Sequence, residues 1–333
     1  MSFTATILQW FRENGRELPW RETCDPYAIW LSEIILQQTQ VKQGRDYWER
    51  FMHRWPTVEL LAAATEDEVL REWQGLGYYS RARNLLHAAR QIVEMGHFPD
   101  TLEAIKSLKG VGDYTAAAIG SIAFNLPAAV VDGNVYRVLS RYFGISTPIN
   151  TTEGKKVFRQ LAQSMLPIQE ASAFNQAMMD FGATQCTPQH PLCMDCPLAE
   201  SCVALRENRV GKLPVKLKKL IIRERYLTYI YIRWNGQTAI HRRGEGDIWQ
   251  GLWEPLLIDS VPADAVVLRQ NVKHVLTHRV IYANFWLWEP AEKPSLPDGY
   301  VWIPEKDVDQ YGVPRLVEIM FDAVCRHIAD RCP

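Results

Sequence analysis

The chain has 333 residues, of which 47% are hydrophobic and 23% are charged. This balance is typical of a folded protein and excludes wholesale disorder. The length suits two domains better than one small core. No stretch approaches the roughly 18 consecutive apolar residues of a membrane helix, and the first ten residues lack a secretory pattern. We therefore expect a cytoplasmic protein that does not contact a membrane.

The net charge of −1 hides an asymmetry along the chain. Residues 1–225 carry 26 basic and 24 acidic side chains, whereas residues 226–333 carry 11 and 14. Between Arg206 and Arg225 there are eight basic residues and two acidic ones. A charge near zero argues against non-specific coating of nucleic acid, but a local basic segment can contact phosphates. A solvated linker is the simpler interpretation.

Residues 1–205 are predicted to be almost entirely helical, because apolar residues recur at intervals of three and four. The pair Asp25–Pro26 suits the N-cap and first turn of a helix. Thr65–Glu68 predicts a capping box, and Asp100–Glu103 predicts a second one.

After residue 225 the pattern becomes that of strands. β-Branched and aromatic residues fill 226–232, and Asn235-Gly236 predicts a hairpin turn into a second strand over 238–240. Further strands and a closing helix are expected over 265–268, 280–287, 300–303 and 314–328. This part is predicted to be an α+β domain, with the boundary in the basic stretch near 212–219.

Four of the seven cysteines lie close together with the spacing C-x6-C-x2-C-x5-C; they are Cys186, Cys193, Cys196 and Cys202. A disulfide framework is unexpected in a long intracellular chain. Four neighbouring thiolates need a shared cation to offset their repulsion. Structural zinc usually joins two close cysteine pairs, and only one pair is close here. The spacing therefore favours an iron–sulfur cluster, with zinc as the alternative.

Residues 108–116 read LKGVGDYTA, in which one helix ends and another begins around Gly110 and Gly112. Glycine permits positive φ and close approach of the backbone. The free N–H groups at the start of the second helix can hold a phosphate oxygen, and Lys109 adds a positive charge. The pattern indicates a helix-hairpin-helix, although two glycines between helices also describe ordinary turns.

Two carboxylates can carry acid–base chemistry. Glu33 interrupts an apolar helix; pointing inward, it would have a raised pKa and could act as a general acid, and pointing outward it would only be solvated. Asp132 precedes a helix, where an N-cap is the simplest role, but a sheltered position would let it stabilise a developing cation. One protonated and one ionised carboxylate are a recurring means of cleaving a glycosidic bond.

Two further segments carry groups suited to nucleic acid. The run QQTQ at 37–40 offers neutral donors and acceptors for base edges. In GLGYYSRAR at 75–83, aromatic rings and a leucine could wedge between bases while two arginines contact phosphates. A tight turn with packed tyrosines is the simpler interpretation of this second segment.

In combination, LSEIILQQTQV, GLGYYSRARNL, LKGVGDYTAAAI, VDGNVYRVLSR and the four-cysteine spacing closely resemble the MutY family of adenine DNA glycosylases. The resemblance covers nearly all of residues 1–205. It implies an all-α helix-hairpin-helix glycosylase domain with a [4Fe–4S] cluster on the four cysteines. It also implies a bacterial-type, nucleoid-associated monomer that flips out and removes adenine paired with 8-oxoguanine or guanine in double-stranded DNA.

The resemblance assigns roles to individual residues. Glu33 corresponds to the acid that protonates adenine N7, and Asp132 to the carboxylate that stabilises the oxocarbenium-like sugar. Tyr114 and Asn134 correspond to polar residues that line the sugar and orient water and the carboxylates. The residues that would contact the base, the mispair or the backbone are Leu18, Trp20, Arg21, Gln38, Thr39, Leu76, Tyr78, Lys109, Gly110, Val111 and Gly112.

Tyr114 separates this family from a close relative. Endonuclease III-like enzymes have a lysine at this position, which forms a Schiff base with the sugar. Tyrosine cannot form one, so we expect a monofunctional glycosylase. The alternatives are a related helix-hairpin-helix glycosylase for another mispair or an oxidised pyrimidine, and a non-catalytic DNA-binding or redox-sensing iron–sulfur protein.

Residues 226–333 resemble, more weakly, the Nudix-like domain of the same family. WQGLWE at 249–254 is similar to its GLWE element, and HVLTH at 274–278 to the loop that reads 8-oxoguanine. That loop usually contains Phe-Ser-His; here Leu276 and Thr277 precede His278, and the threonine keeps a hydroxyl for the N7–H and O8 edge. The Arg/Glu array of Nudix hydrolases is absent from the sequence, so pyrophosphate hydrolysis is not expected.

The expected organisation has three parts. Residues 1–205 form the glycosylase domain with its iron–sulfur loop at 186–202, residues 206–225 a basic linker, and residues 226–333 the α+β Nudix-like domain that recognises 8-oxoguanine.

Overall fold

The computed structural model describes residues 2–217 and 222–331. The contacts divide the chain into two compact units, one of Met1–Ala62 with His87–Lys218 and one of Ala63–Leu86 with Lys219–Pro333. The segment Ala63–Leu86, which the sequence assigns to the glycosylase domain, thus groups with the C-terminal part. Residues 218–221 of the predicted linker lie outside the described residues.

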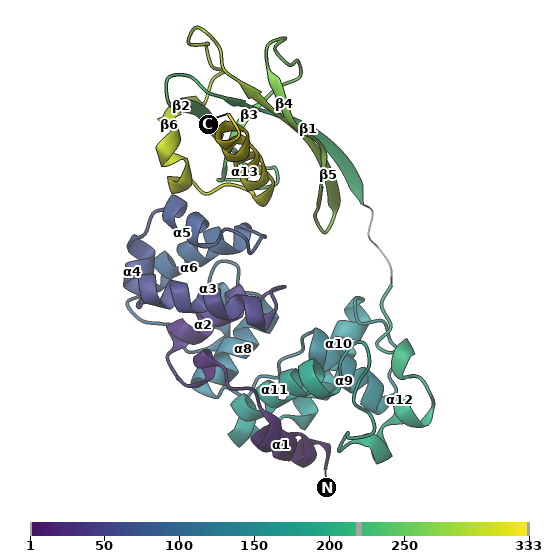
Figure 1. Ribbon diagram of the computed structural model, residues 1–333. Helices are drawn as coiled ribbons and strands as arrows, with labels where there is room; N and C mark the ends of the chain where they lie inside the picture. The colour runs from purple at the N-terminus through teal and green to yellow at the C-terminus, as the bar shows by residue number, and fades with distance from the viewer. Residues whose placement is uncertain (1, 218–221, 332–333) are drawn as a thin grey trace. The chain divides into compact units, whose positions relative to one another are not determined.

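The first unit consists of helices and short helical turns (Figure 1). Its α-helices are α1 (Phe3–Asn14), α2 (Pro26–Ile35), α3 (Val41–Arg54), α4 (Val58–Ala63), α7 (Leu102–Ser107), α8 (Asp113–Phe124), α9 (Gly133–Phe143), α10 (Thr152–Met165), α11 (Ala171–Asp180) and α12 (Val203–Arg206). The shorter turns are η1 (Pro19–Arg21), η2 (Ile168–Glu170), η3 (Phe181–Gln185), η4 (Ala199–Ser201) and η5 (Val210–Lys212). Within the described ranges, no helix is long and apolar enough to cross a membrane.

Local sequence decides where several helices begin. Asp25 caps α2 by accepting from the Tyr27 N–H, as predicted. The Thr65–Glu68 capping box is also confirmed, at the start of α5 (Glu66–Glu72). The second predicted box is wrong: Thr101, not Asp100, caps α7, because the threonine directly precedes the first helical residue.

Two hydrophobic clusters of the first unit lie around the start of α9. The larger one includes Phe158, Phe174 and Phe181 and joins α1, α9, α10 and α11. The smaller one packs Ala118 of α8 against Val130, two residues before Asp132. Because these contacting residues are small, the start of α9 can lie close to α8, and this packing positions the candidate site.

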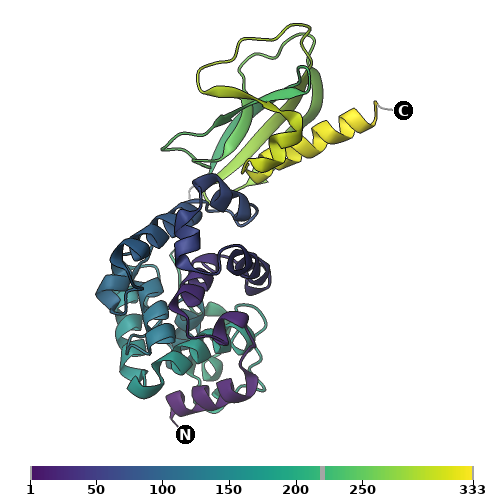
Figure 2. The same ribbon diagram turned by 90° about the vertical axis from the view of Figure 1, so that its left-hand side faces the viewer.

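The second unit contains a six-stranded sheet in the order β4-β5-β1-β3-β2-β6. Its elements are α5, the first part of α6 (Ser80–Met95), β1 (Arg223–Ile232), β2 (Gln237–Arg242), β3 (Trp253–Leu257), β4 (Val266–Val275), β5 (Arg279–Trp288), β6 (Tyr300–Pro304), η6 (Glu305–Gln310) and α13 (Arg315–Ala329). Strands β1 and β5 are parallel, and the other neighbours are antiparallel. Figure 2 shows α13 lying along one face of this sheet.

The predicted hairpin between β1 and β2 is only partly correct. Asn235 and Gly236 both adopt positive φ, as the turn requires, and Trp234 bridges Gln237. Beyond that bridge, β3 lies between the two strands and pairs with both. The sequence analysis missed β3, because Pro255 removes the strand signal from WEPLL.

The two faces of the sheet are packed differently. On one face, Tyr229 and Phe285 pack against Met320 of α13 in the main core of this unit. On the other, Ile230 and Ile232 form a smaller cluster with partly buried neighbours. Residues 258–265 join β3 to β4 without a helix.

Candidate active site

A cavity of about 170 Å³ in the first unit brings the predicted catalytic residues together. Glu33 from α2, Tyr114 from α8, and Asp132 and Asn134 from the start of α9 all line it. An engineered cavity of roughly 150 Å³ is known to hold benzene. The cavity therefore suits one flat base and is too small for a base pair.

Glu33 is buried on a helix whose residues from Tyr27 to Ile35 are all buried. Burial is the main cause that raises the pKa of Glu33 to about 7, and the charge of Asp132 acts in the same direction. The Tyr114 hydroxyl, which donates to Glu33 Oε2 at 3.3 Å, and the charge of Arg21 act in the opposite direction. A carboxyl group with this pKa carries a proton in a large fraction of molecules at neutral pH and can act as a general acid.

Tyr114 lies two residues beyond the glycine turn and points into the cavity. Burial raises the pKa of its phenol well above the ordinary value, and the neighbouring charge of Glu33 adds to this. The hydroxyl also lies 3.8 Å from Sδ of Met179. Tyr114 is therefore a neutral hydrogen-bond donor at neutral pH.

Asp132 fulfils both roles considered from the sequence. It is the N-cap of α9, with Oδ1 accepting from Val135 N at 2.8 Å, and its side chain lines the cavity. Oδ2 accepts from Asn134 Nδ2 at 2.8 Å. Burial raises the pKa of Asp132, while these two hydrogen bonds and the charge of Arg137 favour the carboxylate. Arg137 also holds the Asn134 amide oxygen at 2.7 Å.

The three predicted wall residues Leu18, Trp20 and Arg21 line the same cavity. Arg21 is held there by two hydrogen bonds of 2.8 Å to Asp180, whose side chain is fully buried at the end of α11. Arg16 binds the same carboxylate. The sequence analysis missed Asp180, although a single acidic residue in the apolar run AFNQAMMDFG was a signal for it.

Gln176 and Met179 of α11 also line the cavity, and the sequence analysis missed both. Their spacing of three residues places them on one face of a helix, which could have indicated a shared surface. The Gln176 amide donates to Ser172 Oγ at 3.1 Å and has polar groups suited to a base edge.

The residues predicted to probe the mispair fall in two places. Thr39 follows α2 and lines the cavity, whereas Gln38, which has a φ of 56°, does not. Leu76 and Tyr78 lie between α5 and α6 in the second unit. Of the two residues that belong to the first unit, Thr39 lines the cavity and Gln38 does not.

The hairpin Lys109–Gly112 joins α7 to α8. Gly110 has a φ of 82°, whereas Gly112 is extended and caps α8 without a side-chain hydrogen bond. Val111 is buried, the other three residues are exposed, and a Cβ added at Gly112 would meet nothing within 4 Å. The first N–H groups of α8 are thus accessible to a phosphate.

Asp113, directly after the hairpin, was not singled out from the sequence. Its carboxylate binds Arg159 at 2.6 Å and also Lys106. These two cations lower the pKa of Asp113 to about 2. The acid at the start of α8 is therefore neutralised by its neighbours.

In the second unit, Thr277 and His278 lie in the turn Leu276–His278 between β4 and β5. This turn lines a pocket of about 570 Å³ together with Leu76, Tyr78 and the loop before β3. The hydroxyls of Tyr78 and Thr277 are hydrogen-bonded to each other, although 199 positions separate them. The hydrogen bond thus joins Tyr78, predicted to probe the mispair, to Thr277, predicted to read the oxidised base.

The four clustered cysteines line one small pocket with Arg141 and are free thiols. Arg141 Nη1 lies 3.4 Å from Cys186 Sγ and donates to the carbonyl of Thr187 at 2.7 Å. Burial raises the pKa of Cys196 to about 11, and the charges of the other three cysteines add to this. Four thiolates can therefore share the pocket only with a cationic group.

The arrangement of the four cysteine thiols bears on whether they could hold an iron–sulfur cluster or a zinc ion. Among the described residues, no three His, Cys, Asp or Glu side chains converge as ligands of one metal ion. In a four-iron cluster each cysteine binds its own iron, so the sulfurs need not converge on a point. The four cysteines are therefore compatible with an iron–sulfur cluster, which would take one thiolate on each iron.

Comparisons with known proteins cover both units. Residues 31–165 match the HhH-GPD superfamily of base excision DNA repair proteins, and residues 228–323 match the NUDIX domain. The adenine DNA glycosylase of Buchnera aphidicola subsp. Baizongia pistaciae is 34% identical over 302 residues, covering 86% of each chain. The chain belongs to the adenine DNA glycosylase family. The family assignment made from the five motifs is confirmed.

Other members of the adenine DNA glycosylase family match over shorter ranges. The mouse enzyme is 44% identical over 223 residues, which cover 64% of this chain and 43% of the mouse protein. The chain therefore spans less than half the length of this relative.

Solved structures confirm the predicted fold of the helical part. A thermostable thymine-DNA glycosylase aligns with a TM-score of 0.57 and 33% identity, covering 62% of this chain and 95% of that one. An endonuclease III in a non-covalent DNA complex aligns with a TM-score of 0.54 and 23% identity, covering 62% and 94%. This second likeness supports the fold alone.

Proposed function

We propose that the chain is a monofunctional adenine DNA glycosylase that removes adenine paired with 8-oxoguanine or guanine in duplex DNA. The observation that carries this proposal is the shared cavity in which Glu33, with a pKa of about 7, lies with Asp132. Membership of the adenine DNA glycosylase family supports it.

The proposed reaction cleaves the bond between C1′ of the deoxyribose and N9 of a flipped-out adenine. Neutral Glu33 donates its proton to N7, and the electron pair of the breaking bond moves to the base, which leaves as neutral adenine. The sugar becomes an oxocarbenium-like cation, which the Asp132 carboxylate stabilises electrostatically. Water adds to C1′, and its released proton returns the Glu33 carboxylate to the acid form.

Neighbouring residues keep these groups in place. Asn134 holds Asp132 Oδ2, and Tyr114 donates to Glu33. Arg21, fixed by Asp180, forms part of the wall against which the base would lie. The cavity wall must offset the few kcal/mol that extrusion of a base from the duplex costs.

The direct test is Glu33→Gln, which keeps the shape of the side chain but cannot supply the proton. Single-turnover adenine excision should fall by roughly a hundredfold or more, while DNA binding persists. Glu22→Gln, which alters an exposed carboxylate near the pocket wall, is the control and should retain wild-type rates. Turnover retained in Glu33→Gln would favour a non-catalytic DNA-binding protein.

The absence of a lyase step rests on Tyr114, which offers no amine to the sugar. Borohydride should therefore trap no covalent complex between the protein and DNA during turnover. A trapped complex that forms with the wild-type protein in proportion to excision would contradict the monofunctional assignment.

We assign lesion recognition to the pocket that contains Thr277. Its hydroxyl is the group offered to the oxidised edge of 8-oxoguanine, and Tyr78 holds that hydroxyl. Thr277→Ala should reduce the preference for A:8-oxoguanine over A:G in single-turnover excision, whereas Ser260→Ala, at an exposed position between β3 and β4, should not. Excision of thymine from a T:G duplex in place of adenine would support the related-glycosylase alternative.

We further propose that Cys186, Cys193, Cys196 and Cys202 hold a [4Fe–4S] cluster. The bound cluster would supply the positive charge that lets four thiolates share the pocket. The role of the chain itself is structural here, because Arg141 ties the cysteine loop to α9. Iron and sulfide analysis of anaerobically purified protein tests the assignment, and a monomeric mass in solution tests the expected oligomeric state.

A further inference from the structure

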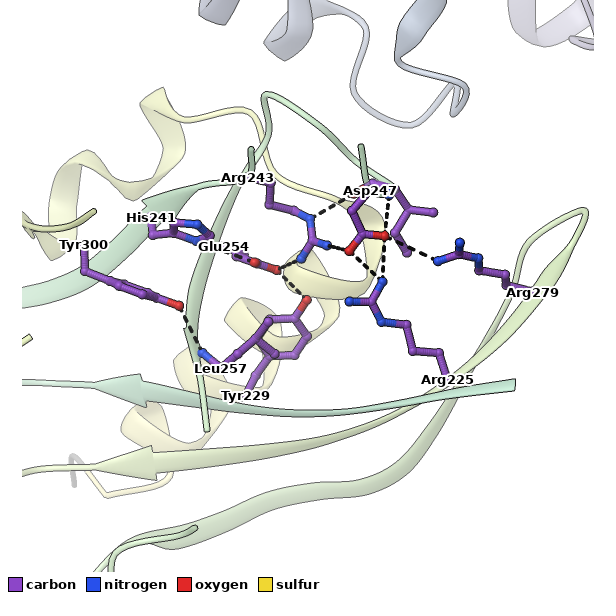
Figure 3. A network of polar contacts seen from close by, with 10 residues as sticks. Arg225, Tyr229, His241, Arg243, Asp247, Glu254, Leu257, Arg279 and Tyr300 are labelled. Carbon is purple, nitrogen blue, oxygen red and sulfur yellow. Dashed lines mark hydrogen bonds and ion pairs between the residues drawn. The ribbon is translucent and has the colours of Figure 1, made fainter. Parts of the chain in front are cut away.

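A network of charged side chains connects the Leu276–His278 turn to the interior of the NUDIX-like domain (Figure 3). Its centre is Asp247, in the loop between β2 and β3. Figure 3 shows three arginines pointing toward this carboxylate. Arg225 of β1 lies at 2.7 Å, Arg243, directly after β2, at 2.6 Å, and Arg279 of β5 at 3.3 Å.

The network is anchored in the core through Arg243, which is only 6% exposed. Arg243 Nη2 binds Asp247, and Arg243 Nη1 binds Glu254 of β3. Glu254 also accepts a hydrogen bond of 2.7 Å from the Tyr229 hydroxyl. Removing one member of a buried, fully paired set is costly, so such a set holds its geometry firmly. Asp247 is therefore connected through Arg243 to the buried core of the domain.

The opposite end of the network reaches the turn that carries Thr277. Arg279 directly follows His278, and its carbonyl accepts from Leu276 N at 2.8 Å. The His278 carbonyl accepts from Arg223 N at 3.2 Å. Asp247 thus binds Arg225 and Arg279, which lie near the starts of the parallel strands β1 and β5, and β5 directly follows this turn.

We propose that Asp247 is a positioning residue that fixes the Leu276–His278 turn, so that the Thr277 hydroxyl is presented to the base opposite the adenine. This inference rests on the proposed lesion-reading role of Thr277. Asp247 contacts no substrate. It acts by pairing with Arg279 and, at the same time, with Arg243, which binds Glu254 in the core.

The net charge of this network allows a positioning role for Asp247 to be distinguished from a role in DNA binding. Three arginines face two carboxylates in this network, so replacing Asp247 by asparagine makes the region more positive. Loss of a negative charge cannot weaken electrostatic attraction to phosphates. Reduced discrimination with undiminished DNA affinity would therefore separate a loosened turn from general damage to the domain.

The experiment compares Asp247→Asn with wild-type protein in single-turnover excision from A:8-oxoguanine and A:G duplexes. We expect a roughly fivefold loss of preference, the effect of one modest ion-pair contribution, with the A:G rate unchanged. Hydrogen exchange should quicken at the Leu276 and Arg223 amides. Glu289→Gln is the matched control, because Glu289 also pairs with two arginines but lies just beyond the far end of β5.

A double-mutant cycle tests whether Asp247 acts through Thr277. In the Thr277→Ala background, Asp247→Asn should cause no further loss of preference. Additive losses would overturn the proposal, as would equal slowing on both duplexes or unchanged exchange at the turn.

Failure of the proposed function is distinguishable from failure of this inference. A wild-type protein that excises adenine equally well from both duplexes overturns the positioning role but leaves the glycosylase assignment standing. A wild-type protein that excises no adenine refutes the proposed function, and the exchange measurement then decides alone whether Asp247 holds the turn.

Discussion

The two candidate catalytic carboxyl groups have different surroundings within one cavity. Glu33 receives one long hydrogen bond, from Tyr114. Asp132 receives two bonds of 2.8 Å, from Asn134 and the Val135 N–H. Hydrogen bonds to a carboxylate favour its charged form, so the two groups are suited to opposite roles, acid and anion.

The first prediction concerns how the rate of adenine excision depends on pH. Because Glu33 has a pKa of about 7 and must be protonated to act, single-turnover excision should fall by about tenfold for each pH unit well above 7. The measurement is the excision rate on saturating A:8-oxoguanine duplex between pH 6 and pH 9. A rate that stays constant across this range would contradict a general-acid role for Glu33.

The second prediction concerns stability. The folded-state pKa of Glu33 lies above its ordinary value of 4.5, so its contribution to the free energy of unfolding is complete below pH 4.5 and is lost as the pH rises through about 7. Glutamine at this position cannot ionise, so Glu33→Gln does not lose this contribution to the free energy of unfolding as the pH rises. The variant should therefore exceed the wild type by up to about 3 kcal/mol at pH 8 and match it near pH 4.5.

Urea unfolding of the wild type and Glu33→Gln at the two pH values measures this difference. Glu22→Gln, at an exposed site, should show no such pH-dependent gain. Parallel stability curves for the wild type and Glu33→Gln would mean that the buried carboxyl group carries no cost on ionisation.

At the scale of elements, close packing between η3 and α9 positions Asp132. A Cβ added at Gly182 would lie 2.6 Å from Asn134 Cβ and 2.9 Å from Asn134 O. The Gly182 carbonyl also accepts from Arg137 at 2.6 Å. The first turn of α9 can therefore occupy its place only because residue 182 has no side chain.

The third prediction is that Gly182→Ala slows excision much more than it weakens DNA binding. The added methyl group must push Asn134 and Asp132 away, and overpacking of this kind costs roughly 1–3 kcal/mol of stability. Gly211→Ala, where the added Cβ meets nothing within 4 Å, is the control. Single-turnover rates together with duplex affinities measure the effect, and a wild-type rate in Gly182→Ala would show that the start of α9 tolerates displacement.

In the whole molecule, each unit contains a large hydrophobic cluster made only of its own residues. The core of the first unit includes Phe174 and Phe181 and has Cys186 and Cys196 packed against it. The main core of the second unit lies between the sheet and α13. A change in the cysteine loop should therefore affect the first core and leave the second intact.

The fourth prediction follows for iron removal. If a cluster binds only the folded loop, its loss lowers the stability of the first unit by mass action. Calorimetry of the chelated protein or of Cys193→Ala should show one transition lowered by several degrees and the transition of the NUDIX-like part unmoved. Cys325→Ala, at an exposed cysteine, is the control. Equal shifts of both transitions would argue against independent cores.

Features that depend only on neighbouring residues could be predicted before the fold was known. The cap of α2 at Asp25, the capping box at Thr65 and the turn at Asn235 each require only a side chain and the backbone within a few positions. The order of the five motifs was likewise sufficient to identify the family. The capping box predicted at Asp100 was wrong by one position, because Thr101 is the cap and helix ends cannot be placed to a single residue from composition alone.

Features that join distant parts of the chain could be found only in the folded protein. Burial of Glu33 depends on helices far away in the sequence, and so does the anchoring of Arg21 by Asp180. The insertion of β3 between β1 and β2 and the meeting of Tyr78 with Thr277 are also long-range contacts. Sequence periodicity reports which face of an element is apolar but not which element will cover it, so these pairings arise only when the whole chain packs.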